Sequence, residues 1–278
     1  MNILEFTGLV FSGSLMAGFL GSLTGMGGGV VIVPLLTLLL GVDIRYAIGA
    51  SLVSVIATSS GAAAAYVKEG FSNIRIGMFL EMATTQGALL GAIIASLIPT
   101  PFIAVLFGMV LIYSAYLSSR TPSRDSNNGA HDPLAARLHM DGTYPGSQGP
   151  VPYYVQAVPT GFSLMFLAGG LSGVLGIGSG AVKVLAMDRA MHIPFKVSTT
   201  TSNFMIGVTA AASAGVYLNR GYIDPGLAMP VMLGVLMGSL LGARVLVGAR
   251  TRWLRLTFAA VILLLGLEMV YNGIAGKL

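Results

Sequence analysis

The sequence predicts an all-α integral membrane protein, and three observations carry that prediction. Only 15 Lys and Arg and 10 Asp and Glu occur among the 278 residues, 9% in all, against about a quarter in soluble domains. Hydrophobic residues make up 55% of the chain and the mean hydropathy is +0.83. The apolar residues stand in continuous runs, which transmembrane barrels lack. This composition excludes intrinsic disorder and makes cytosolic enzymes and nucleic-acid binders poor candidates.

Ten apolar runs are expected to form about ten membrane segments, at roughly 20 residues per crossing. Five lie near 6–24, 29–41, 45–67, 74–97 and 102–118, and five near 153–176, 180–191, 196–219, 225–248 and 254–275. We therefore divide the chain into a first membrane repeat (1–118), a polar linker (119–152) and a second membrane repeat (153–278). The linker is expected to be irregular, although alternation around Asp141-Gly142 and Gly146 also fits a small hairpin.

The two halves are internal repeats. A shift of 151 residues places Gly25, Gly27 and Gly29 over Gly176, Gly178 and Gly180. The same shift continues without a gap and pairs Arg45 with Lys196, Ser51 with Ser202, Thr58 with Thr209 and Tyr66 with Tyr217. One offset held in register over this length indicates duplication rather than coincidence among Gly, Ala and Leu.

The basic residues predict the orientation. If each half crosses the membrane five times, one side carries Lys68, Arg75, Arg120, Arg124, Arg137, Arg189, Lys196, Arg250, Arg252 and Arg255. The other side carries only Arg45, Arg220 and Lys277. By the positive-inside rule the linker is then cytoplasmic and both termini are outside. An odd number of crossings per half inverts the second repeat relative to the first, as in many secondary transporters.

The second run of each half is too short to cross alone. Residues 29–41 would span about 20 Å of helix, against a hydrocarbon core of about 30 Å, so the turn before each short helix is expected inside the membrane. Glycines permit close approach of a ligand, and free N–H groups at a helix N-terminus favour an anion. We predict that the two turns form the walls of an anion site, with Gly25, Gly27, Gly28, Gly29, Gly176, Gly178, Ser179 and Gly180 as lining. The alternative is that these glycines serve helix packing only.

The third run of each half adds hydroxyls and an amide. Such groups donate to an anion without the cost of burying a full charge. Ser51 and Ser202 match between the repeats, and Asn203 follows Ser202, so these three residues are predicted to line the site. For the other hydroxyls, bonding to the carbonyls of their own helix is the better interpretation.

Two ionisable residues lie within apolar runs, where such groups are functional hypotheses by default. Lys183 follows the second turn, and its repeat counterpart is the apolar Ile32. We predict a counter-charge for the anion; a salt bridge and snorkelling to the interface are the alternatives. Glu81 is a candidate proton relay, although pairing with Lys183 or Arg75, or snorkelling, is the favoured interpretation.

Other chemistry is not legible in the sequence. It contains no nucleophile–base pair, phosphate-binding loop or metal-ligand spacing, so no catalytic residue, metal or cofactor is expected. The Gly-xxx-Gly patterns at 87–91 and 234–242 are expected to pack helices together, and they also offer a surface for a homo-oligomer.

The paired glycine motifs resemble those of the TauE/SafE sulfite exporter family. The resemblance rests on GMGGGVVIVP (25–34) and on GVLGIGSG (173–180) with Thr200-Thr201-Ser202-Asn203, and it covers the chain outside the linker. It implies an inner-membrane permease for a small organosulfur anion such as sulfite or a sulfonate, with secondary rather than ATP-driven transport, and we expect coupling to the proton gradient. Ser179 stands where the family usually has glycine, and Leu185 where the first repeat has Pro34, which leaves open a substrate other than sulfite.

The expected partners are thus a small organosulfur anion and the lipid bilayer, with no nucleic acid. Two other functions stay open: an anion channel, and a membrane component that binds a partner through the linker.

Overall fold

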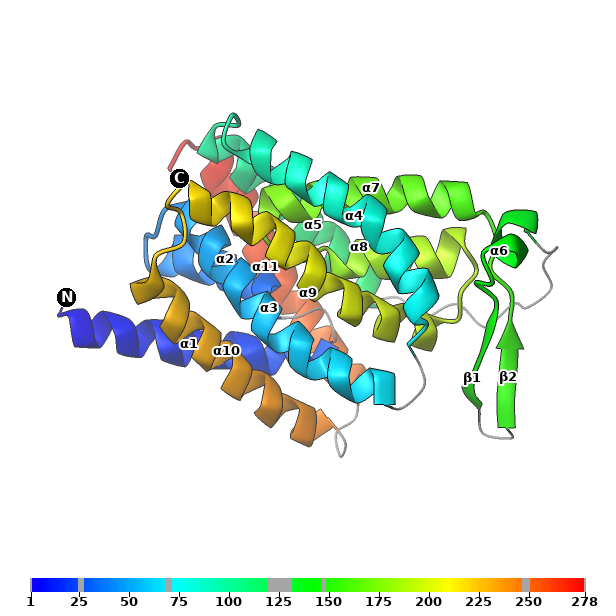
Figure 1. Ribbon diagram of the computed structural model, residues 1–278. Helices are drawn as coiled ribbons and strands as arrows, with labels where there is room; N and C mark the ends of the chain where they lie inside the picture. Colours follow the sequence, from blue (N-terminus) through cyan, green and yellow to red (C-terminus); the bar gives the residue numbers. More distant parts are fainter. Residues whose placement is uncertain are drawn as a thin grey trace.

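The structure, a computed structural model, describes residues 2–24, 28–68, 72–119, 132–146, 149–246 and 251–277. These residues form a helical bundle with a small hairpin at one end (Figure 1). The first half contains α1 (Ile3–Thr24), α2 (Gly29–Pro34), the π-helical segment η1 (Leu35–Leu39), α3 (Ile44–Lys68), α4 (Ile74–Ala95) and α5 (Thr100–Ser119). The second half contains α7 (Val158–Leu175), α8 (Gly180–Leu185), the π-helical segment η2 (Ala186–Ala190), α9 (Phe195–Asn219), α10 (Pro225–Leu246) and α11 (Thr251–Ile274). The predicted all-α class is confirmed.

The boundaries of the helices repeat at the predicted offset. The pairs α2 and α8, η1 and η2, α3 and α9, and α4 and α10 begin and end 151 residues apart. Each short helix passes directly into its π-helical segment, where the hydrogen-bond spacing widens from four residues to five. The duplication seen in the sequence therefore extends to this uncommon backbone feature.

The helices of the two halves exchange partners. α1 packs along α10, while its counterpart α7 packs along α4, the counterpart of α10. The counterparts α3 and α9 contact each other, as do α5 and α11. α5 and α11 run antiparallel: Gly108 packs against Gly266, and Gly273, further along α11, packs against Pro101 at the start of α5. The contacts that the first half makes with the second are therefore equivalent to those that the second half makes with the first.

The Gly-xxx-Gly patterns lie at these helix crossings. A Cβ added at Gly87 would lie 2.0 Å from the carbonyl oxygen of Phe166 in α7, and one at Gly238 would lie 2.0 Å from that of Leu15 in α1. Only glycine permits such an approach of two backbones. Their predicted packing role is confirmed, within the chain; a homo-oligomer through them stays a prediction.

Part of the linker is ordered, which corrects the expectation of an irregular segment. Residues 132–158 contain α6 (Pro133–Arg137) and the antiparallel strands β1 (Gly142–Gly146) and β2 (Gly149–Tyr153). Prolines at 145, 150 and 152 weakened the strand signal, but a two-stranded ribbon has only edge strands, where proline is tolerated. Because β2 continues to Tyr153, α7 begins at Val158 rather than near 153.

The hairpin is fastened to the bundle near the start of α4. The ring of Tyr153 is almost fully buried, and its hydroxyl accepts a hydrogen bond from Asn73 Nδ2 at 2.7 Å. The same Nδ2 lies 3.1 Å from the carbonyl oxygen of Met140. Burial raises the pKa of the Tyr153 hydroxyl. Both ends of the chain lie at the opposite end of the bundle from the hairpin (Figure 1).

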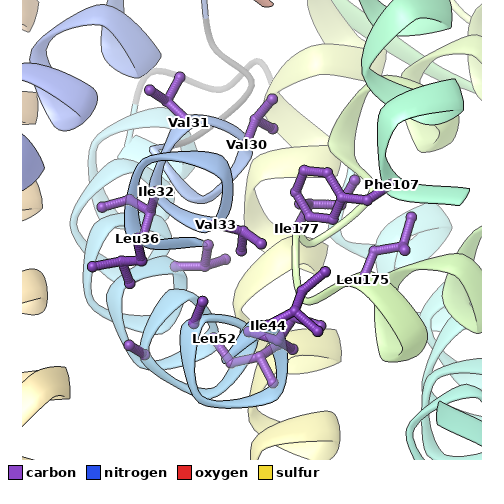
Figure 2. Packing of buried hydrophobic residues seen from close by; sticks show 14 of the residues in the cluster. Val30, Val31, Ile32, Val33, Leu36, Ile44, Leu52, Phe107, Leu175 and Ile177 are labelled. Atoms are coloured by element: carbon purple, nitrogen blue, oxygen red, sulfur yellow. The ribbon is translucent and has the colours of Figure 1, made fainter. Parts of the chain in front are cut away.

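The short helices lie inside the bundle. All six residues of α2 are buried, and Figure 2 shows its side chains beside Leu52 of α3, Phe107 of α5 and Ile177. A helix buried on every side belongs to a large core or a membrane protein.

The outer surface of the bundle is apolar. Along α4, Met78, Met82, Leu90 and Ile94 are 48–62% exposed, while the opposite face is buried. A contiguous stripe of this kind is rare on soluble monomers. By length and composition, two of the helices in the described part of the chain, α4 and α7, are able to cross a membrane.

Candidate functional site

The second glycine turn is buried and left-handed. α7 ends where Gly176 adopts φ +67°, and Gly178 and Ser179 follow with φ of +68° and +45°. Residues 176–180 are all buried. These three positive φ values within four residues turn the chain sharply into α8. Ser179 is the strained position, because a side chain rarely adopts such a φ.

Several polar groups of this turn lack partners. Within the described residues, the N–H groups of Ile177, Gly178 and Ser179 donate to no acceptor. The hydroxyl of Ser179 is buried without a hydrogen bond, as is that of Ser172 one turn earlier in α7. Buried polar groups are nearly always paired, so a cluster of unpaired donors calls for an additional partner. Its chemistry is that of a hydrogen-bond acceptor, as an anion provides.

The repeat-matched serines hold the short helices in place. Ser51 Oγ donates to the carbonyl of Gly176 at 2.9 Å and lies 3.4 Å from that of Gly29. Ser202 Oγ donates to the carbonyl of Gly180 at 3.3 Å. Ser51 therefore joins the first repeat to the turn of the second. With their protons directed at backbone carbonyls, both serines position the turns in this structure rather than donate into them.

Asn203 differs from its serine and threonine neighbours. It is partly buried, and its amide has no hydrogen-bond partner in the described part of the chain. The other hydroxyls of α3 and α9 mostly bond to carbonyls of their own helix, as predicted; these are Ser54, Thr58, Ser59, Ser60, Thr199 and Thr200.

Lys183 and Glu81 form a buried ionic pair. Lys183 is 0% exposed in α8, and its Nζ lies 3.9 Å from Oε2 of Glu81 in α4. Thr209 of α9 lies between them, with its Oγ1 at 2.5 Å from Lys183 Nζ and 2.6 Å from Glu81 Oε1. Of the interpretations open for the two residues, pairing is the one that the structure shows. Arg75, the other candidate partner, is exposed and donates to the carbonyl of His139.

The carboxylate of Glu81 has more hydrogen-bond partners than the ammonium of Lys183. Thr84 Oγ1 and Thr85 Oγ1 donate to its two oxygens at 2.9 Å and 3.1 Å, in addition to Thr209. Lys183 Nζ has one hydrogen-bond acceptor among the described residues, Thr209, although an ammonium carries three N–H groups. The lysine thus retains donors that a second acceptor can use.

This network exists in one half only. The repeat counterparts of Lys183 and Glu81 are Ile32 and Met232, while Thr209 matches Thr58. Ile32 is fully buried in α2. An apolar pair therefore fills the equivalent positions, so the fold does not require charges there. Buried charges that a fold can do without are functional candidates.

The first glycine turn is described only in part. Gly25 and Gly27 lie outside the described residues. Gly28 and Gly29 are buried, and Gly28 accepts N–H bonds from Val31 and Ile32. A Cβ at Gly29 would lie 2.7 Å from Ser51 Oγ, which explains the glycine. No group of three His, Asp or Glu side chains able to hold a metal occurs in the described part of the molecule.

Sequence reasoning missed the threonines of this network. Thr84 and Thr85 are not among the predicted residues, and Thr209 was considered only as a repeat match of Thr58 and as one of the hydroxyls of the third run. Their spacing relative to Glu81, three and four residues further along a helix, is the signal that identifies Thr84 and Thr85 as neighbours of its carboxylate.

The sequence matches the family described as "Sulfite exporter TauE/SafE" over residues 10–269. It is 30% identical to the "Probable membrane transporter protein YunE" of Bacillus subtilis strain 168, over 94% of this chain and 96% of that protein. It is 27% identical to the "Probable membrane transporter protein YdhB" of the same strain, over 85% and 87%. It is 26% identical to the "Probable membrane transporter protein MJ0441" of Methanocaldococcus jannaschii, over 92% of each. No solved structure matches the chain.

Proposed function

The chain belongs to the sulfite exporter TauE/SafE family of membrane transporters, and from this premise we propose that it is a proton-coupled secondary transporter of a small organosulfur anion in the cytoplasmic membrane. Its class is that of a multi-pass membrane transporter, not an enzyme. The observation that carries the proposal is a buried turn whose donors find no acceptor among the described residues, one helical turn before a lysine with a single hydrogen-bond acceptor among them.

We propose that the two halves are inverted repeats. The antiparallel contact of the counterparts α5 and α11 and the exchange of partners between the halves support a two-fold axis across the helices. Such an arrangement brings the two glycine turns toward one another near the middle of the membrane and permits alternating access. The linker would lie in the cytoplasm and both termini outside, as the basic residues favour.

The proposed anion site centres on the second turn. The N–H groups of Ile177 and Gly178 and the hydroxyl of Ser179 would donate to the anion oxygens, and Asn203 would add its amide. The first turn, with Gly25, Gly27, Gly28 and Gly29, would form the opposite wall. Ser51 and Ser202 would hold the turns, and Lys183 would supply the positive charge. A site of preorganised dipoles with one charge suits a monovalent or divalent oxyanion at limited desolvation cost.

The balance of buried charges then couples the movement of the anion to that of a proton. An anion that takes the free donors of Lys183 leaves the Glu81 carboxylate in the bundle without its counter-charge. An unpaired buried carboxylate is costly, so Glu81 binds a proton as the anion binds. Anion and proton would then cross together, and release of both restores the Lys183–Glu81 pair.

The test is a flux assay in proteoliposomes with sulfite, sulfoacetate and thiosulfate, with and without a pH gradient. The proposal predicts that at least one of these anions moves, and that an opposing pH gradient slows it. Flux that ignores the gradient and carries a steady current would instead identify an anion channel. No flux of any of the three would overturn the substrate class.

A further inference from the structure

A narrow cleft lies at the end of the bundle away from the hairpin, between Arg45 at the start of α3, Tyr217 and Arg220 at the end of α9, Tyr222, and the last turn of α4 with Ser96. In this structure the cleft is too narrow to hold a water molecule. The two arginines come from different repeats. They are two of the three basic residues that the sequence placed on this side of the membrane.

Both guanidiniums already donate to backbone carbonyls. Arg45 Nη2 donates to the carbonyl of Ile98 at 3.1 Å, and Arg220 Nη1 donates to those of Ala92 at 3.1 Å and Ile93 at 3.3 Å. These carbonyls lie in and just after the last turn of α4, where cations are favourable. Capping of α4 therefore accounts for one nitrogen of each guanidinium, Nη2 of Arg45 and Nη1 of Arg220.

The remaining donors are not explained by capping. Each guanidinium carries five N–H groups, and Arg45 Nε is buried without a hydrogen bond. Among the residues that the structure describes, no carboxylate lies within ion-pair distance of either arginine. The Arg45 guanidinium lies 5.7 Å from the centre of the Tyr222 ring, which stabilises it but accepts none of its hydrogen bonds well. Two positive charges thus line one cleft, and the described part of the chain offers neither of them a carboxylate at ion-pair distance.

The charges are specific to this end. The repeat counterparts of Arg45 and Arg220 are Lys196 and Glu69. The equivalent positions in the sequence therefore carry one positive and one negative residue, whereas Arg45 and Arg220 are both positive. Helix capping alone gives no reason for that difference.

We propose that the Arg45–Arg220 cleft binds a phosphate- or sulfate-type oxyanion at the outer face of the protein. Arginine is suited to such groups because its planar fork donates two parallel bonds to two oxygens. Arg45 Nε and the unused N–H groups of Arg220 would be the donors. Since the cleft is narrow, the exposed Arg220 side chain moves aside on binding. The oxyanion is either a free solute or the phosphate of an anionic lipid headgroup, and the site does not depend on which solute the protein transports.

Two probes distinguish the sources. Sodium sulfate, titrated against purified full-length protein in a neutral detergent and compared with sodium chloride at equal ionic strength, reports a free oxyanion. Retention of phosphatidylglycerol, measured after exchange into nanodiscs that contain it in a phosphatidylcholine background, reports a headgroup. We expect Arg220→Gln to weaken binding of the responding probe roughly tenfold to a hundredfold, as loss of charge-assisted bonds implies.

Two further variants keep the test decisive. Arg45→Lys preserves the charge and removes Nε, and it should weaken binding while the protein remains folded. Lys277→Gln removes one positive charge from the same end of the bundle and should bind as the wild type does. If neither probe binds, or if Arg220→Gln and Lys277→Gln bind equally, the site does not exist. Sulfate binding identifies a solute site, and binding of phosphatidylglycerol alone identifies a lipid site.

Discussion

Lys183 and Glu81 meet inside the helical bundle, 3.9 Å apart, with the Thr209 hydroxyl between them. They come from α8 and α4, in different repeats, and the equivalent positions Ile32 and Met232 are apolar. The duplicated fold is therefore symmetrical in its backbone but not in its charges. That difference leads to a stability prediction that separates structure from function.

Lys183→Met should destabilise the protein, because it leaves the Glu81 carboxylate buried and unpaired, at a cost of about 3–5 kcal/mol. Lys183→Met combined with Glu81→Gln removes both charges and should recover most of that loss. Thermal unfolding of the solubilised protein measures both effects. A double variant as unstable as the single variant would show that the pair itself is needed for folding.

Ser51→Ala should cost about 1–3 kcal/mol, because it leaves the Gly176 carbonyl without its side-chain donor. Ser202→Ala should cost less, since its bond to the Gly180 carbonyl is longer, at 3.3 Å. Ser60→Ala is the matched control: this exposed hydroxyl bonds to its own helix at Ile56, and its loss should stay within about 0.5 kcal/mol. Chemical denaturation ranks the three; equal effects would argue against the positioning role of Ser51.

Gly238→Ala should separate α10 from α1. The added Cβ would lie 2.0 Å from the Leu15 carbonyl, and overpacking of this kind costs about 1–3 kcal/mol or more. Gly8→Ala is the control on α1, where a Cβ meets nothing within 4 Å. It should leave stability unchanged or raise it by up to about 1 kcal/mol through helix propensity. The melting temperatures of both variants check the expected order.

The linker should loosen in acid. Asp132 accepts N–H bonds from Val158 at 3.0 Å and from Leu134 at 2.9 Å, and these bonds, that of Val158 first, hold the pKa of its carboxyl below its usual range. A lowered pKa contributes stability that is complete above the ordinary value of about 4 and is lost as the pH falls through the lowered value.

Hydrogen exchange checks this expectation. Asp132→Asn at neutral pH should expose the Val158 amide as acid does in the wild type. Asp224→Asn, which affects the Gly226 N–H at the other end of the bundle, should leave Val158 protected. Equal protection in Asp132→Asn and the wild type would contradict the fastening role of Asp132.

Much of the fold follows from the sequence because the duplication constrains it. A single offset predicted which segments are equivalent, and the ends of α3, α4, α9 and α10 respect it to the residue. The short helices were predicted from length alone, since 13 residues do not reach across a bilayer. The π-helical segments that follow them were not predicted, because a widened hydrogen-bond spacing produces no recognisable pattern in an apolar run.

The hairpin shows the opposite case. Three prolines argue against strands as a rule. Within the described residues, however, β1 and β2 form a two-stranded sheet, so the missing N–H groups fall where no third strand needs them. The hairpin also docks on the bundle through the hydrogen bond from Asn73 to Tyr153, a contact between segments far apart in the sequence that no local pattern predicts.

The candidate site was predictable in its residue types but not in its pairings. Their positions within apolar runs made Lys183 and Glu81 candidates, and pairing was one of several interpretations open for each. The choice depended on how α4 and α8 cross, which the repeat pattern does not specify. Likewise, Ser51 was predicted to face an anion, whereas its proton points to the Gly176 carbonyl.

The most direct measurement is uptake of the transported anion by the double variant Lys183→Met, Glu81→Gln in proteoliposomes, alongside its equilibrium binding in detergent. We predict that the double variant folds but neither binds nor transports the anion, and that adding the anion causes no proton flux. A folded double variant that transports the anion at the wild-type rate, with the same dependence on the pH gradient, would contradict the account.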